Sequence, residues 1–401
     1  MRTGCAITVL IERQVTVFKS RALFRWDRKF RSRLPSCFFA AVAVFSGVTA
    51  IAQQGWQLGP FVRPLTGNPV ITPDKAAAFT DPILNAPAHW EALHTFNPAA
   101  VVRGGKVFVL YRAEDDSGTM QIGMHTSRLG LGVSKDGVHF EREAAPVFYP
   151  AKDDQQAREW PGGVEDPRLV ESEDGTYVLT YTQWNRETYS VGIATSRDLH
   201  HWQKHGPAFG ASGKYARLMY KSAGIVTTVK HGKLVATKIR GKYWMYWGEI
   251  HVHLATSDDL VHWTPVEGAN GDPLEVLNAR EGRFDSGFPE TGPPPVLTSH
   301  GIVMIYNGKN SPEHGDPGLG ANAYAAGQVL FAADDPQKIL AREDKPFFFP
   351  SEAYEKTGQY AAGTTFVEGL VLFRGKWFLY YGCADSLVGV AIADSHTGSR
   401  P

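Results

Sequence analysis

One phrase occurs five times in this sequence: GKVFVLYRA (105–113), GTYVLTYTQ (175–183), GKYWMYWGE (241–249), GIVMIYNGK (301–309) and GKWFLYYGC (375–383). Each copy begins with glycine and continues with β-branched and aromatic residues, which favour β-strands. The starting glycines follow one another at intervals of 60 to 74 residues. A period of this kind indicates a protein assembled from similar structural units.

Two further phrases flank each copy. The one that follows has small residues, then Ser-x-Asp and an aromatic residue in its clearest copies, as in VGIATSRDLHHW (191–202) and VHLATSDDLVHW (252–263). This pattern predicts a strand that runs into a tight polar turn, with His139, His200, His201 and His262 in or just after the turns in structural roles. The one that precedes has a polar start and an apolar continuation: NPAAVV (97–102), EDPRLV (165–170), KSAGIV (221–226), ETGPPPVL (290–297) and VEGLVLF (367–373).

Each repeat therefore predicts at least three strands in one order. No long helical periodicity interrupts them, so we expect an all-β protein. Five like sheets bury their faces by packing radially, which predicts a five-bladed β-propeller. Residues 53–401 are expected to form this single catalytic domain, with residues 53–96 closing the ring or covering one face.

The bulk properties narrow the choice of partners and compartment. Lys plus Arg and Asp plus Glu both number 41, so the balance favours neither nucleic acid nor an anionic membrane surface. A basic stretch before residue 34, an apolar run over 37–50 and the sequence Ala50-Ile51-Ala52 are typical of a secretory signal peptide. We expect residues 1–52 to be this signal and an upstream segment, and the mature protein to be periplasmic or secreted, with no membrane attachment beyond the signal. Cys383, the single cysteine after this segment, is predicted to be a buried packing residue.

The functional site is predicted from the polar residues that begin the phrase located before each glycine-led strand. In a propeller the first strand of each blade lines the central channel, so these starts converge at one mouth. Converging carboxylates raise one another's pKa, which provides an acid and a base at neutral pH. Two such carboxylates are what cleavage of a glycosidic bond requires. The converging residues are Asn97, Glu165, Asp166, Lys221, Ser222, Glu290, Thr291, Glu368 and Gly369.

Motifs for other chemistries are missing from the sequence. It has no P-loop, no HExxH and no clustered Cys/His pattern, so we expect neither a cofactor nor a metal. The predicted partner is an oligosaccharide or glycoside substrate.

The ordered motifs FNPAAVV, VLYRAED, GVEDPRLV, VGIATSRDLHHW, GKYWMYWGE, VHLATSDDLVHW and GPPPVLTSHGIVMIYNG resemble glycoside hydrolase family 130 over nearly all of 90–395. That family is five-bladed and contains inverting phosphorylases and inverting hydrolases of β-mannosides. The resemblance implies that Asp166 donates the proton through a sugar hydroxyl and that Arg168 braces its loop. It also implies sugar contacts from Asn97, Arg112, Asp115 and Asp385.

A departure from the family pattern favours hydrolysis. The phosphorylases hold phosphate with His-Arg after the GKY strand, and residues 241–249 lack both after Tyr243. Glu290 and Glu368 would repel phosphate, and either could activate water. We therefore expect an inverting glycosidase with Asp166 as acid, Glu290 as base and Glu368 as the second choice, the acid and base lying roughly 6.5–9.5 Å apart.

The sequence also suggests substrate-binding residues and leaves alternative functions open. Glu165 and Lys221 are predicted to bind substrate, and Tyr246, with Trp244 and Trp247, to stack on sugar rings. Lys221, Lys238 and Arg240 keep a phosphate-dependent phosphorylase open. A non-catalytic carbohydrate-binding propeller and a propeller glycosidase acting on arabinosides or fructosides also remain. The sequence leaves the sugar, the linkage and the oligomeric state open.

Overall fold

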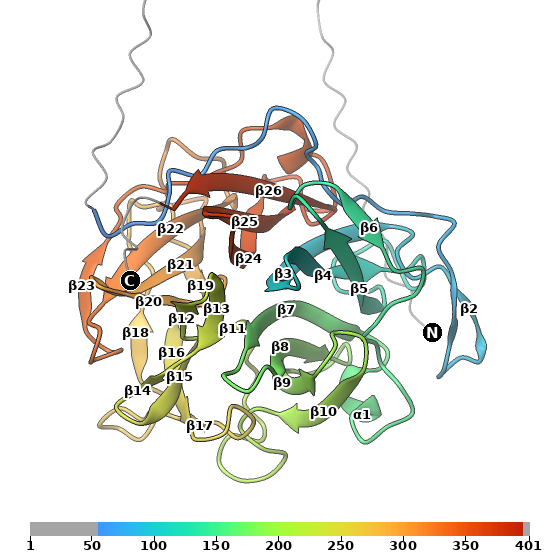
Figure 1. The fold of residues 1–401 in the computed structure, drawn as a ribbon, viewed down its shortest axis with the longest axis horizontal. Coiled ribbons are helices and arrows are strands. Elements are labelled where there is room, and N and C mark those ends of the chain that lie inside the picture. The colour runs from blue at the N-terminus through green and yellow to red at the C-terminus, as the bar shows by residue number, and fades with distance from the viewer. Residues whose placement is uncertain (1–54, 396–401) are drawn as a thin grey trace, which may run out of the picture. The chain divides into compact units, whose positions relative to one another are not determined.

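A computed structural model describes residues 55–395 (Figure 1). The predicted signal peptide and everything before residue 55 lie outside the described residues. The described part belongs to one compact unit, Ala52–Pro401. It contains 26 strands and two short helical segments, α1 (Gln156–Glu159) and η1 (Ala353–Glu355), which confirms the all-β prediction.

Most strands form five antiparallel groups, one for each repeat. The first group is β3 (His94–Arg103), β4 (Lys106–Glu114), β5 (Ser127–Ser134) and β6 (Phe140–Arg142). The second is β7 (Gly163–Glu171), β8 (Tyr177–Trp184), β9 (Tyr189–Ser196) and β10 (Trp202–Pro207). The third is β11 (Ala223–Ile225), β15 (Lys242–Trp247), β16 (Val252–Ser257) and β17 (Thr264–Pro265), with β14 (Lys238–Ile239) and β18 (Glu275–Leu277) beside them.

The remaining groups follow the same order. In the fourth, β19 (Phe288–Thr291) and β20 (Val296–Thr298) pair with β21 (Gly301–Lys309), which continues to β22 (Tyr324–Phe331) and β23 (Ile339–Arg342). The fifth is β24 (Thr365–Phe373), β25 (Lys376–Cys383) and β26 (Leu387–Asp394). The short hairpin of β1 (Phe79–Asp81) and β2 (Ala86–Ala88) precedes them all.

The first strand of each group lies nearest the centre of this unit, and the later strands lie farther out (Figure 1). The hydrogen-bonded sheets do not divide into five, however. One 15-stranded sheet contains the first, second and fourth groups, because β5 pairs with β7, and β12 (Thr227–Lys230) and β13 (Lys233–Ala236) link the second group to the fourth. The third and fifth groups form sheets of six and three strands.

Five hydrophobic clusters lie between successive groups. Tyr111 packs with Tyr380 between the first and fifth groups, and Leu131 with Leu179 between the first and second. The other three clusters continue the series, and they contain Val178 with Met245, Leu254 with Met304, and Val303 with Leu379. Each group therefore buries apolar side chains against both of its neighbours, and burial of this kind is the main stabilising contribution.

The chain before the first group covers the edge of the last one. Val62 pairs with Ile392 and Ile71 with Val388, so residues 62–71 lie along β26. Trp56, Leu58 and Phe61 are buried in the cluster between the fourth and fifth groups. An exposed strand edge invites pairing with other chains, and this segment protects it.

The polar turns have the structure that the Ser-x-Asp pattern predicts. Ser257 Oγ accepts from the backbone N–H groups of Asp259 (3.1 Å) and Leu260 (2.9 Å). Asp259 in turn accepts from the His262 backbone N–H at 2.8 Å and contacts His262 Nδ1 at 2.8 Å. The same contacts recur at Ser134 and Ser196. The histidines at 139, 201 and 262 therefore serve the turns.

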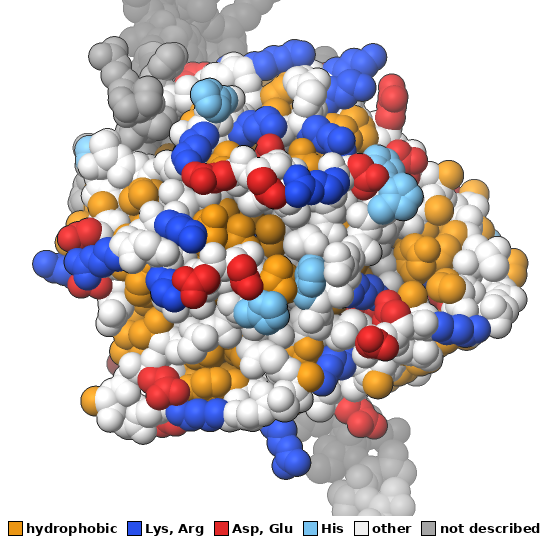
Figure 2. All heavy atoms as spheres, turned by 60° about the horizontal axis from the view of Figure 1, so that its bottom comes forward, with side chains coloured by type: hydrophobic (Ala, Val, Ile, Leu, Met, Phe, Trp, Pro, Cys, Tyr) orange, Lys and Arg blue, Asp and Glu red, His pale blue; other side chains and the backbone are white. Residues whose placement is uncertain are grey.

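The distribution of surface charge (Figure 2) and the burial of Cys383 agree with the expectations from the sequence. Acidic and basic side chains are interspersed over the face shown in Figure 2. Cys383 is free and buried, as predicted. Within residues 55–395, no helix has the length and apolar character needed to cross a bilayer.

Candidate active site

A pocket of about 290 Å³ receives side chains from all five groups. Its charged lining residues are Arg112, Glu165, Asp166, Lys221, Glu249, Glu290 and Asp385. Its aromatic lining residues are Phe96, Trp184, Tyr189, Tyr324, Tyr360 and Phe366. A volume of this size is at the lower end for small-molecule sites.

Irregularities in the inner strands place several of these side chains. The register of β3 slips between Phe96 and Pro98, and that of β7 slips between Glu165 and Arg168. Asn97 and Asp166 occupy these bulges with φ of 45° and 47°. A bulge leaves its extra residue outside the ladder and redirects the side chain, and Asn and Asp tolerate this left-handed conformation. A proline follows each of them, and it fits there because it has no N–H for the ladder.

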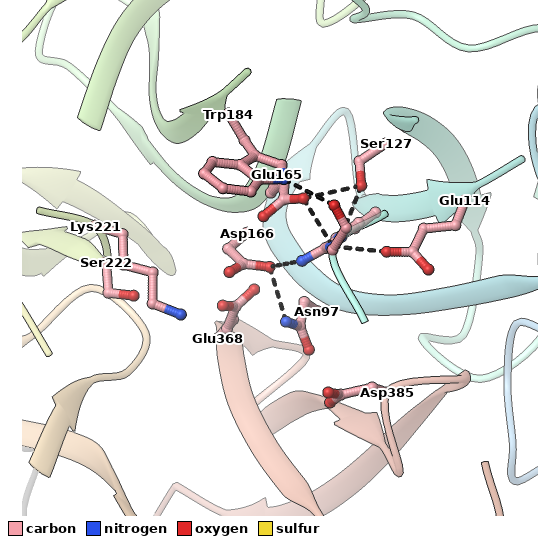
Figure 3. Close-up of polar contacts among 12 residues, drawn as sticks. Asn97, Glu114, Ser127, Glu165, Asp166, Trp184, Lys221, Ser222, Glu368 and Asp385 are labelled. Atoms are coloured by element: carbon pink, nitrogen blue, oxygen red, sulfur yellow. Dashed lines mark hydrogen bonds and ion pairs between the residues drawn. The ribbon is translucent and has the colours of Figure 1, made fainter. Parts of the chain in front are cut away.

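Arg112 organises one side of the pocket by binding three carboxylates, those of Glu114, Glu165 and Asp166, which Figure 3 labels. Its guanidinium donates to Asp166 Oδ1 at 3.0 Å, to Glu165 Oε1 at 2.8 Å and to Glu114 Oε1 at 2.6 Å. Asn97 Nδ2 donates to the same Asp166 oxygen at 2.8 Å. One oxygen of Asp166 is thus held by two donors, while Oδ2 accepts no side-chain hydrogen bond within residues 55–395.

Neighbouring carboxylates on this side differ in proton affinity. Burial raises the pKa of Glu165 to about 7, although Arg112 opposes the shift. Burial acts on Asp166 too, but Arg112, Lys221 and Arg168 hold the pKa of that carboxyl at about 2. Asp385 is also buried, and its pKa rises to about 7. Between these two values Glu165 is protonated and Asp166 is ionised, so the two neighbouring carboxyls together retain one proton.

A second charged cluster lies around Lys221. Its Nζ is 3.3 Å from Glu249 Oε2 and 3.6 Å from Glu290 Oε1. Ser222 Oγ donates to Glu290 Oε1 at 2.5 Å, whereas Glu290 Oε2 is buried without a hydrogen-bond partner in the described structure. Burial raises the pKa of Glu290. Burial alone would lower the pKa of Lys221, but Glu290 and Glu249 raise it well above its ordinary value, so this cation stays charged.

Seven of the predicted site residues line this one pocket: Asn97, Arg112, Glu165, Asp166, Lys221, Glu290 and Asp385. Arg168 lies beneath the pocket, where it donates to the Asp166 carbonyl at 3.0 Å and to the Thr291 carbonyl at 2.6 Å. This is the bracing contact that was expected of Arg168.

Glu368 lies beside Asp166 (Figure 3) but is wholly buried and is not among the lining residues. Arg168 Nη1 is 2.9 Å from Glu368 Oε1, yet neither carboxylate oxygen has a partner with hydrogen-bond geometry in residues 55–395. Burial raises the pKa of Glu368 well above its usual range despite Arg168. Its assignment as a second base is not supported, because its carboxylate is wholly buried against Arg168 and does not line the pocket.

Two residues predicted to contact sugar, Tyr246 and Asp115, do not line the pocket. Tyr246 is fully buried, and its hydroxyl donates to the Pro336 carbonyl at 2.8 Å. Its place on β15 turns it into the core between the third and fourth groups, and neither Trp244 nor Trp247 lines the pocket. Asp115 does not line the pocket either, because both of its oxygens are used inside the protein, one of them by Arg128 at 2.7 Å.

Sequence reasoning missed Glu249 and the aromatic walls. Antiparallel pairing places the end of each second strand beside the start of its first strand, as in the pairs Phe96–Arg112 and Glu165–Thr182. Glu249 follows the end of β15 and makes an isolated bridge to Glu290. Applied to the sequence, this pairing of strand ends would have identified Glu249 and Trp184. Tyr324 and Tyr360 have no comparable signal in the repeats.

A metal centre finds no support in this geometry. Among the described residues, no group of three or more His, Cys, Asp or Glu side chains is arranged to hold a metal ion. The side chains at the pocket can accept and donate protons and can stack on a ring.

The fold and site define an all-β protein with an acidic pocket at the meeting point of its strand groups. A family model described as β-1,4-mannooligosaccharide phosphorylase matches residues 76–397, so the chain belongs to glycoside hydrolase family 130.

A named relative and two solved structures resemble the chain over most of its length. It is 31% identical over 309 residues to a 1,2-β-oligomannan phosphorylase from Thermoanaerobacter sp. (strain X514), covering 76% of this chain and 91% of that protein. A glycosyl hydrolase from Bacteroides ovatus is 52% identical with a TM-score of 0.83, covering 86% of this chain and 96% of that one. A further structure is 52% identical with a TM-score of 0.84, covering 86% of this chain and 97% of that one. It comes from work on glycoside hydrolases of this family that target β-1,2 mannosidic linkages in Candida mannan.

Proposed function

We propose that this protein is an inverting hydrolase of β-mannosides, with β-1,2-linked mannosides as its substrates. The linkage follows two relatives, the 1,2-β-oligomannan phosphorylase and the structure associated with β-1,2 mannosidic linkages. The choice of water over phosphate rests on the charges of the pocket.

The pairing of Lys221 with two carboxylates, Glu249 and Glu290, is the observation that carries the proposal. The lining contains five carboxyl groups and two cations, Arg112 and Lys221. Arg112 is bound to Asp166, Glu165 and Glu114, and Lys221 lies between Glu249 and Glu290. Neither cation is available to a phosphate dianion, which would also face the surrounding carboxylates. The two other cations considered for phosphate, Lys238 and Arg240, are exposed on or beside β14 and do not line the pocket.

The acid of this reaction is assigned to the Glu165–Asp166 pair. The pair holds one proton up to about pH 7, because Glu165 has a pKa of about 7 beside the ionised Asp166. The proton comes from Glu165, which is the protonated member of the pair up to about pH 7. The Oδ2 of Asp166, which accepts no side-chain hydrogen bond within residues 55–395, would relay it to the substrate, directly or through a sugar hydroxyl.

The base is assigned to Glu290, with Glu249 as the alternative that the geometry adds. Glu290 has one oxygen bound to Ser222 and the other unpartnered among the described residues, so that oxygen can accept a proton from water. Lys221 contacts both glutamates and can stabilise the negative charge of whichever one is ionised.

We also propose that the five groups are the blades of a five-bladed propeller. The five hydrophobic clusters that join successive groups, including the last to the first, support this arrangement.

The test is to incubate the protein with β-1,2-mannobiose, with and without inorganic phosphate. We expect free mannose at the same rate in both cases, and a loss of about 10²–10⁴-fold in kcat for D166N and for E290Q. Formation of mannose 1-phosphate would establish the phosphorylase instead. Binding of the disaccharide without turnover would establish the non-catalytic reading.

A further inference from the structure

We propose that Ile122 and Trp184 form the surface that binds the leaving sugar, and that the loop carrying Ile122 determines how well that sugar is held. The loop comprises residues 115–126, between β4 and β5, and is called the β4–β5 loop below. The inference rests on the proposed function, because it assigns the leaving-group side of the same pocket.

The pocket has a buried polar end and an exposed apolar rim. Asn97, Asp166 and Arg112 are 5%, 5% and 6% exposed. Ile122 also lines the pocket but is 54% exposed. A sugar ring bound among the buried carboxylates must therefore extend its next ring past Ile122 on the way to solvent.

Trp184 is fixed in a position suited to stacking. Its indole Nε1 donates to the Gly123 carbonyl at 2.9 Å, so the ring is tied to the β4–β5 loop. Its ring lies 6.3 Å from that of Tyr189, and the Tyr189 hydroxyl donates to Glu249 at 3.3 Å. An immobilised aromatic face loses little entropy on binding and suits the apolar face of a pyranose ring.

The neck of the loop is clamped by a buried network. Asp115 Oδ1 accepts from the backbone N–H groups of Ser117 and Thr126, both at 3.1 Å. Asp115 Oδ2 accepts from Arg128 at 2.7 Å, and Arg128 donates to Asp81 of β1 at 2.6 Å. Asp115 is therefore a positioning residue that closes the loop.

The two limbs of the loop are also too close together for a side chain at Gly118. This residue has φ of +78°, and an added Cβ would lie 2.0 Å from the Met124 carbonyl oxygen. The clamp and this close approach hold Ile122 and Gly123 against the pocket.

The occupant is identified by its chemistry. A half-buried indole and an exposed aliphatic side chain offer apolar contact, whereas the hydrogen-bonding groups lie deeper in the pocket. The surface therefore fits the ring face of a neutral sugar in the leaving position, with its hydroxyl groups directed to water.

The experiment compares two substrates of the full protein. In β-1,2-mannobiose the leaving group is a sugar that reaches the rim. In β-mannosyl fluoride it is a fluoride ion that cannot reach it. The variants are W184A, W184F and I122A, with M120A as a matched control, because Met120 is on the same loop but is 77% exposed and does not line the pocket.

We expect W184A to lower kcat/KM for mannobiose by 10- to 100-fold and I122A by three- to tenfold, mainly through KM. Both should act on mannosyl fluoride within twofold of wild type, W184F should retain more activity on mannobiose than W184A, and M120A should match wild type on both substrates. Equal losses on the two substrates, or no loss on mannobiose, would overturn the inference. Failure of the proposed function would look different, since the wild-type protein itself would then require phosphate or process neither substrate.

Discussion

Individual carboxyl groups in the pocket acquire different proton affinities from their immediate contacts. Asp166 and Glu165 are adjacent in the chain, yet the pKa of the first is about 2 and that of the second about 7. Asp166 faces Arg112, Lys221 and Arg168 together, whereas burial dominates at Glu165. A site that separates the two values in this way has both a proton donor and a stable anion at neutral pH.

This separation predicts the pH dependence of the reaction. The proton of the pair leaves as pH rises through the Glu165 value, so kcat/KM should fall about tenfold per pH unit above about 7. On the acid side, activity should fall as Glu290, whose pKa is raised, becomes protonated and can no longer accept a proton. In E165Q the pair has no proton to lose near pH 7, so the alkaline limb should be absent and the plateau activity reduced.

A pH–rate profile from 5 to 9 checks this prediction, with D385N as the matched control, because the pKa of Asp385 is also about 7. An alkaline limb that disappears in D385N but persists in E165Q would assign the titrating proton to Asp385 instead.

Glu368 provides a second test among the buried acids. Its raised pKa and its lack of a hydrogen-bond partner in the described structure mean that glutamine, which resembles the neutral acid, fits its place. We expect E368Q to keep kcat within about threefold of wild type, while E290Q loses about 10²–10⁴-fold. The measurement is kcat of both variants at saturating substrate. A large loss in E368Q with little loss in E290Q would make Glu368 the base.

At the scale of strands, the repeated sequence phrases predicted the strands of the fold. The residues at the ends of the inner strands predicted part of the site. The second strand of every repeat formed where glycine and the aromatic run predicted it, as β4, β8, β15, β21 and β25. The starts of the first strands predicted Asn97, Asp166 and Glu290 because adjacent inner strands bring their ends together. The face of a strand was harder to assign. Tyr246 alternates with its neighbours on β15, and only the packing of the fourth group shows that it faces the core.

The polar turns allow a stability prediction at this scale. Ser257 is buried, and its hydroxyl accepts from two backbone N–H groups, one of them on the buried Leu260. S257A should lower the free energy of unfolding by about 1–2 kcal/mol with kcat unchanged. Urea denaturation measures the change, and S196A, in the equivalent turn of the second group, should behave alike. An unchanged midpoint in both variants would show that the turns do not depend on these hydroxyls.

At the scale of the whole described unit, stability depends on every group packing against two neighbours. Residues 55–71 add to this packing at the last group, where Trp56, Leu58 and Phe61 are buried while Val62 and Leu65 are exposed. The sequence predicted that this region covers or closes the fold, but its contact with β26 required the structure, because residues 62 and 392 are far apart in the chain.

A pair of leucines in this segment tests its contribution. Leu58 is 1% exposed in the cluster between the fourth and fifth groups, while Leu65 is 104% exposed. L58A should lower the free energy of unfolding by about 2–5 kcal/mol, and L65A by less than about 0.5 kcal/mol. Equal urea midpoints for the two variants would mean that the segment contributes nothing to the packing.

In the proposed reaction water, and not phosphate, attacks the mannosyl unit from the side opposite the leaving group. The most direct measurement is a proton NMR time course of β-1,2-mannobiose cleavage in buffer that contains inorganic phosphate, following the anomeric signals before mutarotation. We predict an initial excess of α-mannose over its equilibrium share and no mannose 1-phosphate, because the attacked unit is released as the α anomer while the leaving mannose keeps the anomeric mixture of the reducing end. The appearance of mannose 1-phosphate, or an initial excess of β-mannose, would contradict this prediction.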